Sequence, residues 1–132
     1  MNIVVCVKHV PDAQSERTFR ESDSTIDREG VDGLLSELDE YAVEEALKLV
    51  EAAGEGEVTV LTVGPAGAAD AIKKALQMGA HAGIHVSDDA IHGSDAAATS
   101  LVLAEAVKKA TGGSPELVLT GMASTDGVMG VV

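Results

Sequence analysis

Four apolar runs alternate with three stretches of helical pattern along this chain, and this alternation limits the fold more than any other feature. The first run, Asn2–Lys8, is β-branched and apolar on both faces, as a central strand of a parallel sheet is. Strands that alternate with helices need right-handed crossovers and a sheet that is covered on both faces. We therefore predict one α/β domain over residues 1–132, with a doubly wound, mostly parallel sheet. The other three expected strands are Glu57–Gly64, Ala82–Asp88 and Pro115–Gly121.

Each stretch between these runs carries the signals of a helix. In the first, Ser36 and Asp39 have the spacing of a capping box, and Gly54 supplies a stop at the carboxyl end. In the third, either Ser94 or Asp95 is suited to cap the amino end. The expected helices are Ser36–Gly54, Pro65–Ala80 and Gly93–Gly113.

Residues 11–35, called the polar segment below, interrupt this regular pattern. The segment is polar and broken, and it separates the first strand from the first helix. Its pieces Arg17–Arg20 and Ser24–Asp27 alternate between polar and apolar residues. This alternation predicts a small hairpin within the segment.

Charge and composition exclude several classes of protein. Twenty-two acidic residues face nine basic ones, and the net charge of −13 argues against binding to nucleic acid or to an anionic membrane. An apolar fraction of 45% argues against disorder. The single cysteine, Cys6, excludes an internal disulfide, and no apolar run approaches the roughly 20 residues that span a bilayer. We expect a cytoplasmic protein without membrane insertion.

The residues after the fourth strand are the most informative about ligands, because open parallel sheets bind ligands outside the carboxyl ends of their strands. The glycine-rich loop, Gly121–Gly130, reads GMASTDGVMG, with three glycines, two hydroxyls and no lysine or arginine. Small residues let backbone amides approach a phosphate closely, and a helix start adds a positive end. Composition alone leaves two readings open, a nucleotide-binding loop and an ordinary turn between strand and helix.

Other motifs are absent or have a structural reading. No GxGxxG follows the first strand and no GxxxxGK[ST] occurs, which argues against a nicotinamide dehydrogenase and a P-loop NTPase. His81 and His85 lie four residues apart on a strand, where this spacing does not bring them to one ligand. His92, near three aspartates, makes a weak case for a metal. Nothing assembles a nucleophile, base and orienter, so we expect no catalytic residue and no metal site.

Six motifs, in order along the chain, resemble the β subunit of electron transfer flavoprotein. They are VVCVKHVPD, DEYAVEEALKL, VTVLTVGP, KALQMGAHAGIHVSD, DAAATSLVLAEAV and ELVLTGMASTDGVMG. The resemblance covers the whole chain apart from Ala13–Leu35, and it implies a Rossmann-like fold of the adenine-nucleotide-binding type. Because family β subunits continue well beyond this point, the chain is similar to the N-terminal portion of one.

The resemblance implies an electron carrier rather than an enzyme. Such a subunit forms a heterodimer with an α subunit that binds most of the FAD, and it holds a structural AMP of its own. The pair accepts electrons from flavoprotein dehydrogenases, such as the acyl-CoA dehydrogenases of fatty acid β-oxidation, and passes them to a quinone reductase. Two alternatives are an electron-bifurcating relative with a second FAD in place of AMP, and a stand-alone adenine-nucleotide-binding protein of the stress type.

The resemblance also implies which residues would contact the nucleotide. Two departures stand out: SELD replaces the Asn-Pro-aromatic-Asp of many members, and Ala13 replaces an aromatic residue that some members place near the flavin. The implied contacts are Cys6, Ser36, Glu37, Leu38, Asp39, Val63, Gly121, Met122, Ala123, Ser124, Thr125, Asp126, Gly127, Val128, Met129, Gly130, Val131 and Val132.

Overall fold

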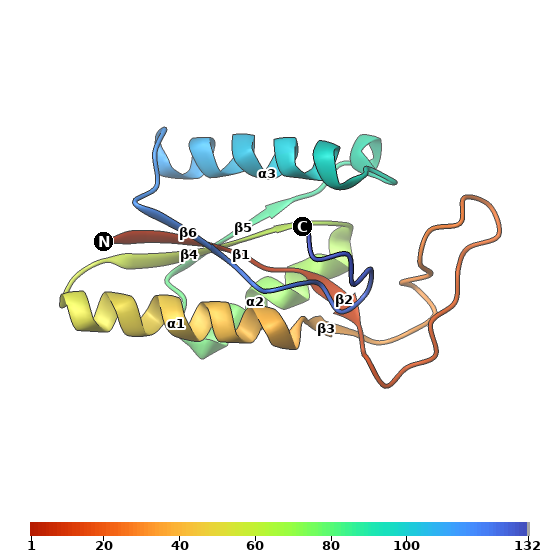
Figure 1. The fold of residues 1–132 in the computed structure, drawn as a ribbon, viewed down its shortest axis with the longest axis horizontal. Helices are drawn as coiled ribbons and strands as arrows, with labels where there is room; N and C mark the ends of the chain where they lie inside the picture. Colours follow the sequence, from red (N-terminus) through yellow and green to blue (C-terminus); the bar gives the residue numbers. More distant parts are fainter. Residues whose placement is uncertain (132) are drawn as a thin grey trace.

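A computed structural model describes residues 1–131 and shows a parallel sheet between two layers of helices (Figure 1). Two short 3₁₀ turns, Ala66–Ala68 and Asp89–Ile91, precede the second and third helices. The elements are β1 (Asn2–Cys6), β2 (His9–Pro11), β3 (Gly33–Leu35), α1 (Glu37–Ala53), β4 (Glu57–Val63), α2 (Ala69–Met78), β5 (Ala82–Val86), α3 (Ala96–Thr111) and β6 (Leu117–Thr120).

The main sheet has the strand order β5-β4-β1-β6, and all of its pairs are parallel. Helices α1 and α2 cover one face, and α3 covers the other (Figure 1). The predicted doubly wound α/β fold is therefore confirmed. The chain runs from β1 outward to β4 and β5, then crosses back to place β6 on the other side of β1. The direction of winding thus changes between β1 and β6, which makes this gap the switch point of the sheet.

The core is aliphatic and lies on both faces of the sheet. Because successive strand residues point to opposite faces, Val5 packs with the α1 and α2 layer while Val4 packs toward α3. Val5 lies beside Val60 of β4, and both are fully buried. On the opposite face, Leu61 packs in the cluster that contains Val4 and α3. This packing fixes β1 and β4 at the centre of the molecule.

The helix ends follow most of the sequence signals. Gly54 and Gly112 end α1 and α3 in the left-handed conformation, with φ of 76° and 69°, which favours glycine. Asp95 is the cap of α3, and its carboxylate accepts a hydrogen bond of 2.8 Å from the N–H of Ala98. Ser94 instead donates to the carbonyl of Ile91. No helix among residues 1–131 is long and apolar enough to cross a bilayer.

The polar segment leaves the sheet at the carboxyl end of β1. The first strand ends at Cys6 rather than Lys8, and the chain then forms β2, which pairs antiparallel with β3. Further out, Phe19 and Ile26 form one antiparallel bridge where the sequence predicts a small hairpin. The segment extends away from the sheet beyond β2 and β3 (Figure 1). Both of its ends thus lie near the carboxyl ends of the strands.

A substitution in the core tests this packing. Leu61→Ala removes a fully buried side chain that β4 places against α3, so we expect a loss of about 2–5 kcal/mol in the free energy of unfolding. Leu101→Ala, on the outer side of α3 where the residue is 65% exposed, should change it by less than about 0.5 kcal/mol. Thermal unfolding of the full-length variants measures both. Equal losses would contradict the assigned orientation of α3.

Candidate functional site

The switch point between β1 and β6 brings together two loops that are far apart in the sequence. Residues Lys8 and His9 follow β1, and the glycine-rich loop follows β6. The register of β1 on β6 pairs Cys6 with Thr120, so the segments that follow the two strands leave the sheet at the same level. The start of α1 lies beside them, because the N–H of Ser36 bonds the carbonyl of Lys8 at 3.0 Å. Three segments thus surround one corner of the sheet.

Asp39 joins these three segments from the first turn of α1. Its carboxylate accepts a 2.7 Å hydrogen bond from the backbone N–H of Lys8, and the N–H of Gly121 points to the same group. The side chain is buried, at 6% exposure. The predicted capping box is therefore wrong: the Ser36 side chain makes no cap hydrogen bond, and Asp39 faces the strand ends instead. Among residues 1–131, the buried Ser36 hydroxyl has no hydrogen-bond partner.

Residue 121 must be a glycine because its backbone lies very close to Asp39 and to Leu38. A Cβ at this position would collide with Oδ1 of Asp39 and would press on the backbone of Leu38. The end of β6 can therefore approach the start of α1 only without a side chain. Sequence reasoning singled out Gly121 for an approach to a ligand, whereas here the neighbouring atom belongs to the protein.

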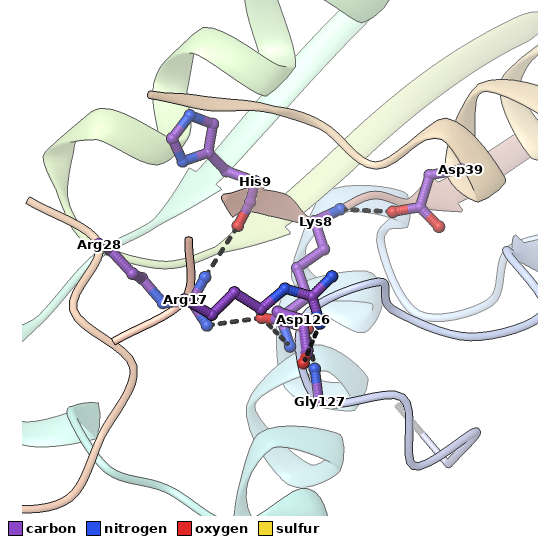
Figure 2. Close-up of polar contacts among 7 residues, drawn as sticks. All are labelled: Lys8, His9, Arg17, Arg28, Asp39, Asp126 and Gly127. Atoms are coloured by element: carbon purple, nitrogen blue, oxygen red, sulfur yellow. Dashed lines mark hydrogen bonds and ion pairs between the residues drawn. The ribbon is translucent and has the colours of Figure 1, made fainter. Parts of the chain in front are cut away.

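Asp126 is the centre of an ion-pair cluster on the glycine-rich loop. Its Oδ2 lies 3.1 Å from Nζ of Lys8 and 2.6 Å from a guanidinium nitrogen of Arg28. The N–H of Gly127 donates to Oδ1 at 2.7 Å, and Arg17 donates to the backbone carbonyl of Asp126 at 3.4 Å. Figure 2 shows these side chains converging on the carboxylate, which is 1% exposed. The two cations therefore satisfy a buried charge.

The two carboxylates titrate in opposite directions. Burial raises the pKa of Asp39 to about 6, although the N–H groups and charge of Lys8 and the N–H of Gly121 oppose the rise. Burial also acts to raise the pKa of Asp126, but the Ser124 hydroxyl, Arg28 and Lys8 outweigh it. They hold the pKa of Asp126 well below its ordinary value. Asp126 is thus a fixed negative charge, while Asp39 loses its proton near pH 6.

Most predicted site residues lie around this corner. Cys6 is half-buried at the end of β1, where burial raises the pKa of its thiol and keeps it protonated. Glu37 is exposed and Leu38 is half-buried at the start of α1. Val63 ends β4, on the side of β1 away from β6, and so lies farther from the glycine-rich loop in the strand order. That these residues contact a nucleotide stays a prediction.

The glycine-rich loop itself has a buried part and an exposed part. Ser124 and Asp126 are buried, and Ala123 and Thr125 are half-buried. The remaining described residues of the predicted set are exposed: Met122, Gly127, Val128, Met129, Gly130 and Val131. Val132 lies outside the described residues. The loop is therefore anchored through its middle, with an open surface on its later residues.

Sequence reasoning missed the cations that organise this corner. Lys8 is the last residue of the first predicted strand, and its position at a strand end was the only signal that it carried. Arg17 and Arg28 carried no signal, because Arg28 is 98 residues from Asp126 in sequence and sits in a segment without a pattern. Of the chain's nine lysines and arginines, these three gather at one loop. The sequence described the loop as free of cations, but the fold supplies them from elsewhere.

Three of the four histidines have structural partners. His81 accepts a hydrogen bond from the N–H of Val58, and His85 donates to the carbonyl of Gly64 at 2.9 Å. His92 pairs with Asp23 of the polar segment at 2.9 Å. In the part of the chain that the structure describes, no group of three or more His, Cys, Asp or Glu is placed to hold a metal ion.

Comparison with known proteins agrees with this geometry. The family model "Electron transfer flavoprotein domain" matches residues 23–132. The chain belongs to the electron transfer flavoprotein family. It is 50% identical over 135 residues to the electron transfer flavoprotein subunit beta of Mycobacterium leprae, covering 99% of this chain and 50% of that one. It is 45% identical over 129 residues to protein FixA of Rhizobium meliloti, covering 96% of this chain and 44% of that one. The chain thus spans about half the length of these family members.

Gly121 tests the junction of α1 with the strand ends. Gly121→Ala places a Cβ against Asp39 and the Leu38 backbone, so we expect a loss of about 1–3 kcal/mol in the free energy of unfolding. Gly127→Ala is the matched control in the same loop, because its Cβ would meet only Ser124 Oγ at 4.0 Å. It should cost less than about 0.5 kcal/mol. Thermal unfolding distinguishes them, and similar losses would refute the collision.

Asp39 gives this family member a distinctive dependence of stability on pH. Its pKa in the folded state, about 6, lies above the value of 3.8 for a free carboxyl, so the folded state holds this proton more tightly. The stability of the wild type should therefore fall relative to Asp39→Asn as the pH rises from 4 to 6. Above pH 6 the difference should level off. Thermal unfolding of both proteins across this range measures it, and parallel curves would show that Asp39 does not titrate in this way.

Proposed function

We propose that this chain is the N-terminal part of the β subunit of a heterodimeric electron transfer flavoprotein, with an adenine nucleotide bound at the switch point. In this proposal the cytoplasmic pair carries electrons from flavoprotein dehydrogenases, such as acyl-CoA dehydrogenases, to a quinone reductase. The partner is an α subunit that holds most of the FAD. The flavin supplies the redox chemistry, so this chain acts as a carrier subunit and not as an enzyme by itself.

One observation carries the proposal for the nucleotide. Lys8, Arg17 and Arg28 converge on the glycine-rich loop of a strongly acidic chain, at the place where doubly wound sheets bind their ligands. Asp126 pairs with Lys8 and Arg28, and Asp39 bonds the backbone N–H of Lys8, so the three cations outnumber these two carboxylates by one when both are ionised. In this proposal the local cations attract an anionic group, whereas the net negative charge of the whole chain repels it. This charge pattern fits the phosphate of AMP.

The polar groups around the corner also suit a nucleotide. The buried Ser36 hydroxyl, without a partner among residues 1–131, is an unused hydrogen-bonding group beside the start of α1. Residues Gly127–Gly130 are exposed; the N–H groups of Gly127 and Val128 bond Asp126 and Ser124, and the backbone of Met129 and Gly130 is left to approach a phosphate. In this proposal Lys8 and Arg28 hold the loop in place through Asp126, while backbone groups of the later loop bind the ligand.

The first experiment counts nucleotides. We would co-express the full-length β subunit with its α partner, denature the purified complex and quantify released nucleotides by chromatography. Equal amounts of AMP and FAD support the proposal. Two FAD without AMP would replace it with the electron-bifurcating alternative. A protein that purifies without an α partner but holds an adenine nucleotide would indicate the stand-alone alternative.

The charge pattern predicts the effect of removing one cation. Lys8→Gln keeps the backbone N–H that bonds Asp39 but removes the ammonium group beside the loop, so we expect roughly fivefold weaker AMP binding. Lys48→Gln is the matched control, since Lys48 is exposed on α1 and pairs with Glu44 and Glu45. It should leave AMP binding unchanged. Calorimetric titration of nucleotide-depleted protein measures both, and equal affinities would remove the electrostatic support for the site.

A further inference from the structure

We propose that Arg28 is a positioning residue that couples the polar segment to the glycine-rich loop, so that nucleotide binding and docking of the segment favour each other. The ligand in this inference rests on the proposed function, whereas the coupling itself rests on contacts within the chain.

Arg28 is the link because its guanidinium group reaches two elements at once. One nitrogen lies 2.6 Å from Oδ2 of Asp126, and another donates to the carbonyl of His9 in β2 at 3.3 Å. Figure 2 shows the side chain lying between β2 and the loop. The planar fork of an arginine suits such a double contact. A side chain 31% exposed therefore joins three parts of the chain.

The rest of the polar segment follows Arg28 through contacts of its own. Arg17, on the other arm of the segment, donates to the backbone carbonyl of Asp126 at 3.4 Å. The bridge between Phe19 and Ile26 joins the two arms to each other. At the tip, Asp23 pairs with His92, which follows β5. The segment is thus tied to the loops after β1, β5 and β6.

The ion pair links order in the segment to order in the loop. The buried Asp126 carboxylate lies against Lys8 and Arg28, so a loop that moves away breaks these ion pairs. A ligand that holds the loop in place therefore strengthens docking of the segment. By reciprocity, a docked segment strengthens ligand binding by the same factor.

Arg20 provides a matched comparison within the segment. Its guanidinium group lies 3.2 Å from Glu29, which is 86% exposed, and it makes no ion pair with the glycine-rich loop among residues 1–131. Arg28→Gln and Arg20→Gln thus remove the same charge from the same segment. Only the first breaks a contact with Asp126.

The test uses the full-length protein purified with its α partner, depleted of nucleotide, with and without added AMP. A protease that cleaves after glutamate reports on the segment, because Glu16 and Glu21 are exposed and neither variant changes them. In the wild type and in Arg20→Gln, AMP should slow cleavage at these sites by about fivefold or more. In Arg28→Gln the cleavage rates with and without AMP should be nearly equal. A general loss of stability raises both rates and leaves their ratio unchanged, so the ratio reports coupling.

Equal AMP protection in Arg28→Gln and Arg20→Gln would overturn the inference. Arg28→Lys serves as the conservative variant, since it keeps a charge beside Asp126 and should recover part of the protection. If Arg28→Lys recovers no AMP protection, the ion pair with Asp126 is not the link.

A failure of the proposed function would look different. If neither AMP nor FAD binds the wild type, the nucleotide assignment fails, and the cleavage rates without ligand decide the coupling. Arg28→Gln should then be cleaved at Glu16 and Glu21 several times faster than Arg20→Gln, because its segment is released from the loop. Equal rates in the two variants would overturn the coupling as well.

Discussion

Lys8 makes two contacts on which the whole corner of the sheet depends. Its backbone N–H bonds the carboxylate of Asp39, and its ammonium group pairs with Asp126. The first contact fixes α1 against the end of β1, and the second fixes the glycine-rich loop. Because β1 is a central strand between β4 and β6, Lys8 is held by the most buried part of the core. The position of the site thus follows from the packing of β1.

The two carboxylates around Lys8 show how environment decides charge. Asp126 has two cations and a hydroxyl beside it, so it stays ionised even when buried. Burial disfavours the ionised form of Asp39, the negative charge of Asp126 adds to this, and the Lys8 charge and the N–H groups of Lys8 and Gly121 offset it only in part. Replacing either residue by its amide would therefore have opposite electrostatic consequences. The ionised Asp126 organises the loop through cations, whereas Asp39 organises the strand ends through backbone contacts.

The sequence predicted the fold from strong local patterns and the site only in part. Apolar runs and helix stops such as Gly54 give the order of elements, because each signal is local. The role of Asp39 was misread, since its spacing from Ser36 matches a capping box and only the tertiary contact with Lys8 decides otherwise. Gly121 was predicted to approach a ligand, and in the structure its close neighbours are Asp39 and the backbone of Leu38. Tertiary contacts overruled local signals at the site, whereas in the main sheet the four parallel strands were predicted and only strand ends shifted, as where β1 ends at Cys6 rather than Lys8.

The partner residues of Asp126 were beyond local reasoning for a further physical reason. An ion pair across 98 residues leaves no periodic trace, and the polar segment that supplies Arg28 has no apolar face that predicts its docking.

The distribution of charge then explains why this pairing matters in so acidic a chain. All three arginines lie between residues 17 and 28, while every lysine except Lys8 lies on a helix. The field of the whole chain repels anions, but at physiological salt such repulsion fades beyond roughly 8 Å. Close to the glycine-rich loop, the local cations therefore outweigh the distant carboxylates. In the proposed site, attraction for an anionic group depends on the polar segment being docked, and this would make Arg28 as much a part of that site as the loop that it contacts.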